Sequence, residues 1–88
     1  ILPYGNIDMR TLFTPKTIGE AVRKTRKLLN VTQKDLALTS GTGLRFIIDL
    51  EKGKPTAQIG KIITVLNTLG IQLDLKHPTL QNEKNKSQ

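Results

Sequence analysis

The chain has 88 residues and a formal net charge of +7 at pH 7, with 14 lysines and arginines against 7 acidic residues. It contains no cysteine, which excludes disulfide bonds and thiolate metal sites, and no apolar run approaches the length needed to span a membrane. The length allows one small domain, and the basic charge favours either a polyanionic partner or a soluble basic surface. We therefore expect a soluble cytoplasmic protein whose small core depends on aliphatic residues and is completed by oligomerisation.

Three regions can be distinguished along the chain. Residues 1–13 mix apolar residues with Pro3, Gly5 and Asn6, which is typical of irregular structure, so we treat them as an N-terminal extension. A folded domain is predicted at residues 14–76. The remaining residues, 77–88, are almost wholly polar and predict a disordered tail.

The first predicted helix runs from Thr14 and Pro15 to about Asn30. The Thr14 hydroxyl can accept a hydrogen bond from a first-turn amide, and proline fits the first turn because no amide donor is needed there. Thr17 and Glu20 offer an alternative capping box three residues later. The residues expected on its inner side are Ile18, Ala21, Val22, Thr25, Leu28 and Leu29. Those expected on its outer side, as a solvated face or alternatively as contacts to DNA phosphates, are Arg23, Lys24, Arg26 and Lys27.

Two short helices joined by a glycine turn are predicted next, and this arrangement is a candidate helix-turn-helix. Thr32 is the expected N-cap of the first of them, with Asp35 at the third helical position, and this helix should end near Thr39. The small Ala37 lets the following helix approach closely. Gly41 can adopt the positive φ that a tight interhelical turn needs.

The second helix of this motif is expected at residues 44–52, with Gly53 as its C-terminal cap. Ile47 and Leu50 lie three residues apart, so both should face the core. A fourth helix is expected at residues 56–69. Its expected core residues are Ile59, Ile62, Ile63, Leu66 and Leu69.

Beyond Gly70, apolar and polar residues alternate, and Ile71, Leu73 and Leu75 fall on one side of a predicted strand. A lone strand leaves its backbone groups unpaired, so it must pair with the N-terminal segment or with the same strand of a second subunit. We predict the second arrangement. The expected fold is therefore an all-α bundle of four main helices with a C-terminal β-strand that pairs across a homodimer.

The sequence offers no recognisable enzyme chemistry. Its one histidine, His77, precedes a proline and has no second histidine or cysteine to complete a metal site. Gly41 and Gly43 lack the preceding strand and the following Lys-Ser/Thr of a phosphate-binding loop. The acidic residues are dispersed and form no general acid and base pair. We therefore expect no catalytic residue, no metal and no cofactor.

In a helix-turn-helix, the second helix of the motif lies in the major groove of double-stranded DNA. Arg45 is the best candidate base reader because its guanidinium can grip guanine bidentately; a phosphate contact or an ion pair with Asp49 are the alternatives. Leu44 and Ile48 could contact thymine methyl groups or pack against a protein. Gln33 could hydrogen-bond a phosphate or cap its own helix.

Other residues of the motif are expected to contact the DNA backbone. Gly43 leaves the first amides of the recognition helix open to a phosphate, and Lys52 and Lys54 follow that helix. The complete set of expected DNA-binding residues is Thr32, Gln33, Lys34, Thr42, Gly43, Leu44, Arg45, Ile48, Asp49, Lys52 and Lys54.

Two runs of the sequence carry a resemblance to a known family. They are TPKTIGEAVRKTRKLLNVTQKDLA and LRFIIDLEKGKPTAQIGKIITVLNTLGIQL, and the second is the more specific. Through them, residues 14–75 resemble the Xre/Cro-type helix-turn-helix family with its lambda-repressor-like bundle. Within that family the chain is similar to the HipB-like antitoxins of type II toxin–antitoxin systems.

The resemblance implies a dimer that binds a palindromic operator, represses its own operon and holds a HipA-like serine/threonine kinase toxin inactive. By motif position it implies DNA contacts at Gln33, Thr42, Gly43, Leu44, Arg45 and Lys52. It also implies that Ile71, Leu73 and Leu75 form the dimer ribbon. The chain departs from the family pattern at Ser40 and Thr42 in the turn and at Gly43 and Ile48 on the reading face.

Two alternatives to the antitoxin remain open at this stage. One is a stand-alone repressor of the Xre/Cro type, with the same DNA chemistry and no toxin partner. The other is a protein-interaction adaptor that has lost DNA binding, which is suggested by the aliphatic Leu44 and Ile48 on the reading face.

Overall fold

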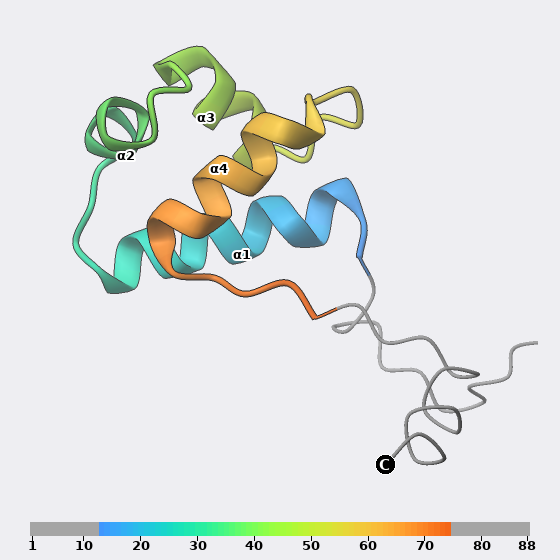
Figure 1. Ribbon diagram of the computed structural model, residues 1–88, viewed down its shortest axis with the longest axis horizontal. Helices are drawn as coiled ribbons and strands as arrows, with labels where there is room; N and C mark the ends of the chain where they lie inside the picture. The colour runs from blue at the N-terminus through green and yellow to red at the C-terminus, as the bar shows by residue number, and fades with distance from the viewer. Residues whose placement is uncertain (1–12, 75–88) are drawn as a thin grey trace, which may run out of the picture.

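The computed structural model describes residues 13–74, which form four helices. They are α1 (Pro15–Leu28), α2 (Gln33–Ser40), α3 (Leu44–Glu51) and α4 (Ile59–Leu69). Figure 1 shows α2 and α3 together on one side of the molecule and α1 on the opposite side, with α4 crossing in front of α1. None of the helices in the described range is long and apolar enough to cross a membrane.

Helix α1 begins at the cap that its sequence predicts. The Thr17 amide donates to the Thr14 hydroxyl at 3.0 Å, and the Thr14 amide donates to the Thr17 hydroxyl at 2.9 Å. This reciprocal pair satisfies two backbone donors at the start of the helix. The alternative capping box at Thr17 and Glu20 is therefore not the start of α1. The helix ends at Leu28.

The cap of α2 and the turn after it also match the prediction. The Thr32 hydroxyl accepts from the Asp35 amide at 3.0 Å, and Gly41 closes the helix in the left-handed conformation with φ 70°. A residue with a side chain would be strained there, so the glycine fixes the place where the chain turns into α3.

Helix α4 begins at Ile59, three residues later than predicted. Pro55 and Thr56 form a turn, and Gln58 is the N-cap residue, whose carbonyl accepts from the Ile62 amide at 3.1 Å. Proline fixes its own φ and the turn that contains it continues through Thr56, so the chain becomes helical only after it.

The core is apolar and joins all four helices. The buried hydrophobic residues are Val22, Leu36, Ala37, Ile47, Leu50, Val65, Leu66 and Leu69, and the half-buried ones against them are Ile18, Val31, Phe46, Ile62 and Ile71. The predicted core positions Val22, Ile47, Leu50, Leu66 and Leu69 are thereby confirmed.

Several predicted core positions are wrong. Leu28 and Leu29 are 74% and 54% exposed, because the last turn of α1 extends past the helices that cover its earlier turns. Ala21 is also exposed. In α4 the buried set is centred on Val65 and Leu66, which leaves Ile59 at 72% and Ile63 at 40% exposure on one flank of the helix.

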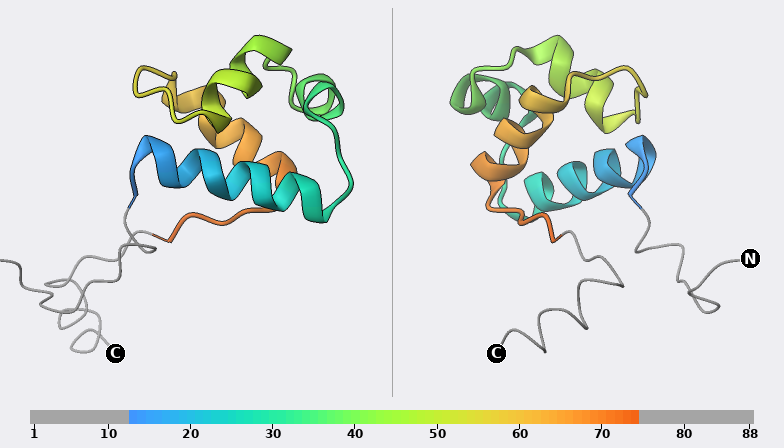
Figure 2. Two further views of the ribbon diagram at one scale, coloured as in Figure 1. Left: turned by 180° about the vertical axis from the view of Figure 1, so that it is seen from behind. Right: turned by 45° about the vertical axis from the view of Figure 1, so that its right-hand side comes forward.

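The predicted C-terminal strand is not formed in residues 71–74. The Ile71 amide donates to the Leu66 carbonyl at 2.9 Å, and Ile71 packs against the core, whereas Leu73 is 43% exposed. Figures 1 and 2 show this segment running along α1. The described residues do not include Leu75, residues 1–12 of the N-terminal extension or the tail at 77–88. Pairing of the strand across a dimer therefore stays a prediction.

Candidate nucleic-acid interface

The outer side of α3 forms the centre of the candidate interface. Ile47 and Leu50 are buried in the core, so the opposite side of α3 faces outward. The Arg45 side chain is 79% exposed and Leu44 is 43% exposed, while Ile48 is half-buried beside them. Gly43, the N-cap, offers no side chain to the first amides of α3. The helix therefore presents a cation, two aliphatic side chains and open backbone donors on one face.

Asp49 lies on that face but is engaged by two cations. Its carboxylate is 3.4 Å from Arg45 Nε and 3.5 Å from Lys54 Nζ, and its backbone carbonyl accepts from the Lys54 amide at 3.1 Å. The ion pair of Arg45 that the sequence left open is thus present. Exposed pairs of this kind are weak, so a guanine could replace the carboxylate at the guanidinium. Asp49 thus lies between the Arg45 guanidinium and the Lys54 ammonium.

Gln33 is held by a partner that the sequence analysis did not identify. Its Nε2 donates to Glu51 Oε1 at 3.1 Å, which places the start of α2 beside the last turn of α3. Capping of α2 belongs to Thr32, so the capping role considered for Gln33 is wrong. The second Nε2–H of its amide is left to donate to an acceptor such as a phosphate oxygen.

Glu51 is itself fixed by a buried arginine. Arg26 Nε donates to Glu51 Oε2 at 2.7 Å and Arg26 Nη2 to Glu51 Oε1 at 3.1 Å, with side-chain exposures of 10% and 4%. Arg26 Nη1 donates to the Val31 carbonyl at 2.9 Å. Arg26 was predicted on the outer side of α1, and this prediction is wrong because the carboxylate and the carbonyl compensate its burial.

A sequence signal for this arrangement did exist. Arg26 follows the buried Val22 by four residues and Gly19 by seven, which places all three on one face of α1. A Cβ atom at Gly19 would collide with the Leu50 carbonyl oxygen, so α1 and α3 are in backbone contact at this point. An arginine on such a face requires a buried acidic partner, and Glu51 is one residue past the core position Leu50.

The remaining predicted site residues are divided between structural and exposed positions. Thr32 is used as the α2 cap, and the Thr42 hydroxyl lies 2.9 Å from the Ser40 hydroxyl inside the turn. Lys34 and Lys52 are exposed near the two ends of the motif. The structure thus gathers Gln33, Lys52 and the outer side of α3 around the contact between α2 and α3.

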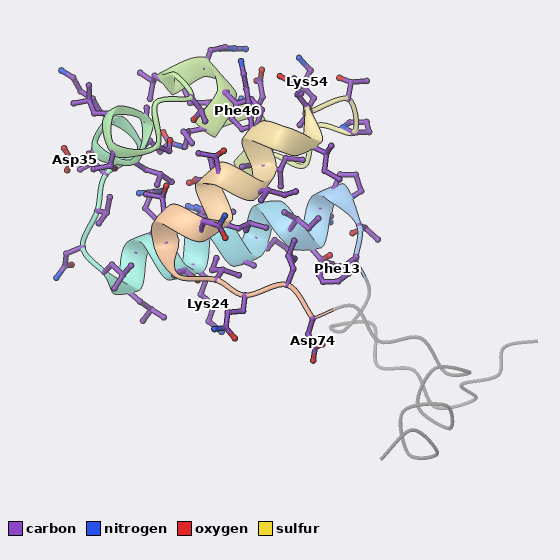
Figure 3. The ribbon with its side chains drawn as sticks, viewed as in Figure 1. Phe13, Lys24, Asp35, Phe46, Lys54 and Asp74 are labelled. Atoms are coloured by element: carbon purple, nitrogen blue, oxygen red, sulfur yellow. The ribbon has the colours of Figure 1, made fainter. Side chains whose placement is uncertain are left out.

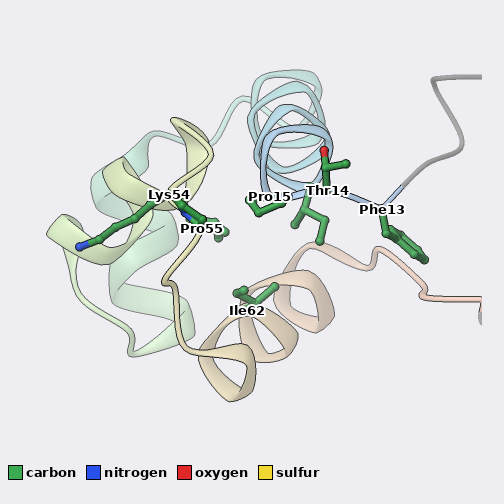
Figure 4. Close-up of a pocket in the computed structure, with 8 residues that line it drawn as sticks. Phe13, Thr14, Pro15, Lys54, Pro55 and Ile62 are labelled. Carbon is green, nitrogen blue, oxygen red and sulfur yellow. The ribbon is translucent and has the colours of Figure 1, made fainter.

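An apolar hollow of about 130 Å³ lies elsewhere, between the start of α1 and the α3–α4 connection (Figure 4). Phe13, Pro15, Pro55 and Ile62 contribute to its wall, and Figure 4 shows the Lys54 ammonium pointing away from it. Such a wall provides no convergent polar groups for catalysis. Within residues 13–74, no group of three or more His, Cys, Asp or Glu residues could hold a metal ion.

Four helices with α2, a glycine turn and an exposed α3 define a helix-turn-helix protein. A family model described as a helix-turn-helix domain matches residues 19–76, and the chain belongs to this family, whose members are DNA-binding regulators rather than enzymes. A relative from Sinorhizobium fredii (strain NBRC 101917 / NGR234), named "Uncharacterized HTH-type transcriptional regulator y4mF", is 57% identical over 65 residues. The match covers 74% of this chain and 86% of that relative.

Two solved structures share the fold. A "HipB-O4 20mer complex" matches with a TM-score of 0.69 at 19% identity and covers 76% of this chain and 94% of that chain. A complex of a HipB variant with an O2 20mer matches with a TM-score of 0.70 at 18% identity and covers 80% and 97%. The four-helix, HipB-like fold expected from the resemblance is therefore confirmed.

Proposed function

We propose that the protein is a DNA-binding antitoxin of a type II toxin–antitoxin system that binds a palindromic operator as a dimer and represses its own operon in the cytoplasm. The observation that carries the DNA-binding part is the exposed α3, with Arg45 paired with Asp49 and with Gln33 fixed beside the end of the same helix. The Arg45 fork contributes base contacts, and Gln33, Lys52 and Lys54 contribute phosphate contacts.

The dimer is proposed from an uncovered apolar flank. Ile59 and Ile63 lie one turn apart on α4 and are 72% and 40% exposed. Leu73, in the segment that follows α4, is a separate exposed apolar side chain at 43%. Burying such residues against a second copy removes apolar surface from water and leaves the outer side of α3 free. Ile71, Leu73 and Leu75 would then form the paired strands.

A HipA-like serine/threonine kinase toxin is the proposed protein partner. This part rests on the sequence resemblance to HipB-like antitoxins and on the shared fold with HipB. Affinity purification of the protein from native cells, followed by mass spectrometry, tests it. A stoichiometric kinase-like protein is the expected result, whereas DNA binding without such a partner would contradict the antitoxin role.

A stand-alone repressor is the second candidate, favoured by the relative that is 57% identical and named a transcriptional regulator. Both candidates predict footprints on the promoter of the protein's own gene. Nuclease footprinting should reveal two protected half-sites whose centres lie about one helical turn of DNA, 34–36 Å, or a multiple of it apart. A single unpaired footprint would count against the dimer in both.

A further inference from the structure

Helix α1 has an inner face and an outer face with different chemistry. Gly19, Val22 and Arg26 form the inner face, which contacts α3 through the backbone at Gly19 and the ion pair of Arg26. At 100° per residue, Lys24 and Leu28 fall on the opposite side of the helix. Figure 3 shows Lys24 at the edge of the molecule that faces away from α3. This outer face therefore cannot touch DNA that lies on the outer side of α3.

The outer face is strongly basic. Arg23, Lys24 and Lys27 are exposed and, together with the single acid Glu20, border a shallow hollow of about 270 Å³. Among the described residues, none of these three cations has an ion-pair partner, since the pairs found there involve Arg26, Arg45 and Lys54. Three neighbouring cations raise a positive potential that an acidic surface would complement.

An exposed leucine lies next to these cations. The side chain is that of Leu28, which follows Lys24 by four residues and is 74% exposed. A phosphate backbone has no apolar surface against which a leucine could be buried, whereas a protein surface does. A protein–protein interface has an apolar core and a polar rim, so an exposed leucine bordered by cations fits the edge of such an interface.

We propose that the outer face of α1, defined by Arg23, Lys24, Lys27 and Leu28, is a docking surface for an acidic protein with an apolar spot. A second copy of this chain is not the occupant, because its described acids form no acidic patch. In its described part, Asp49 and Glu51 are in ion pairs, Asp35 caps α2, Asp74 is engaged, and Glu20 lies among the cations of this same face. The occupant is therefore a different protein, and it can bind while α3 is on DNA. The inference deepens the proposed function by locating the partner's surface, and it rests on that function only for its biological role.

The test uses the isotope-labelled full chain and a defined probe, an amphipathic helical peptide with glutamates on one side and leucines on the other. Peptide binding is followed by amide chemical shifts. The expected shifts cluster at residues 23–29 and leave α3 unchanged. A peptide with lysines in place of the glutamates is the matched probe and should not bind.

Lys24→Glu is the test variant and Lys61→Glu the matched control. Both change the net charge equally, but Lys61 is an exposed residue of α4 whose ammonium lies over the Phe46 ring, outside the outer face of α1. Lys24→Glu should lower peptide affinity about fivefold more than Lys61→Glu. The two variants should have equal affinity for duplex DNA.

Three results would overturn the proposal. They are shifts confined to α3, equal loss of peptide affinity in the two variants, and shifts at residues 23–29 caused by a 20-base-pair duplex, which would make this face a nucleic-acid surface. Operator binding by the wild-type chain is measured in the same series. If the wild-type chain did not bind its operator, the proposed DNA-binding function would be refuted, but the conclusion from the peptide experiment would be unaffected.

Discussion

Arg26 of α1 and Glu51 of α3 form a buried, two-pronged ion pair, with Nε–Oε2 and Nη2–Oε1 distances of 2.7 and 3.1 Å. Glu51 also accepts a hydrogen bond from the side-chain amide of Gln33. One carboxylate therefore fixes α1, the start of α2 and the end of α3 relative to one another. In this way the core sets the spacing between Gln33, the proposed phosphate contact, and α3, which carries the proposed base contact.

Removing one member of this pair should strongly destabilise the fold. Arg26→Ala leaves the carboxylate of Glu51 buried without its cation, and we expect the free energy of unfolding to fall by about 3–5 kcal/mol. Urea denaturation followed by circular dichroism measures it. The neighbouring exposed Arg23→Ala is the control and should change stability by about 0.5 kcal/mol or less.

The double substitution Arg26→Met with Glu51→Leu provides the opposite comparison. It removes both charges, so most of the stability lost in Arg26→Ala should return. If the double variant were no more stable than Arg26→Ala, desolvated charge would not be the reason for the loss.

Gln33 should contribute to DNA affinity without sequence preference. Gln33→Ala leaves the Arg26–Glu51 pair intact and removes a donor to a phosphate, so we expect a loss of about 1.5–3 kcal/mol on operator and shuffled duplexes alike. Fluorescence anisotropy at constant salt measures both affinities. A loss limited to the operator would instead show that Gln33 contacts a base.

Arg45 should behave differently, because its proposed role is to read a base. Arg45→Ala should cost about 1–3 kcal/mol on the operator and much less on a shuffled duplex. Arg45→Lys keeps the charge but not the bidentate fork, and should restore non-specific affinity while discrimination stays low. Equal losses on both duplexes would identify Arg45 as a phosphate contact.

Features that depend on neighbouring residues were predictable from the sequence, whereas features that depend on distant residues were not. The caps of α1 and α2 at Thr14 and Thr32 and the turn at Gly41 depend on residues within four positions, so local sequence was sufficient to predict them. The burial of Arg26 depends on Glu51, 25 residues later, and no local pattern contains that pairing.

The apolar residues of α4 occupy more of the helix surface than the other helices of one subunit bury. Ile59 and Ile63 match the helical period as well as Ile62 and Leu66 do, so the sequence predicted all four as core. Which part of the apolar surface is buried depends on how α4 is rotated against α1 and α2. Within residues 13–74, the flank that stays exposed is the one that we assign to the dimer.

Disrupting this flank should therefore separate subunits without unfolding them. Ile63→Asp places a charge on the proposed interface, and we expect the dimer to become a monomer in sedimentation velocity at micromolar concentration while helix content is kept. The matched control is Leu38→Asp on α2, where a leucine is 75% exposed outside the proposed interface. A shift to monomer in both variants, or in neither, would contradict the assignment of the interface to α4.

The central claim is that this chain binds its own operator through α3, and a salt titration of operator affinity tests it most directly. Anisotropy with the promoter duplex and a shuffled duplex should give an affinity that falls linearly with salt on logarithmic axes, with a slope of about −0.9 per phosphate contacted. The promoter duplex should bind about 10³-fold more tightly than the shuffled duplex throughout. Affinity that is independent of salt, or equal for the two duplexes, would contradict the account.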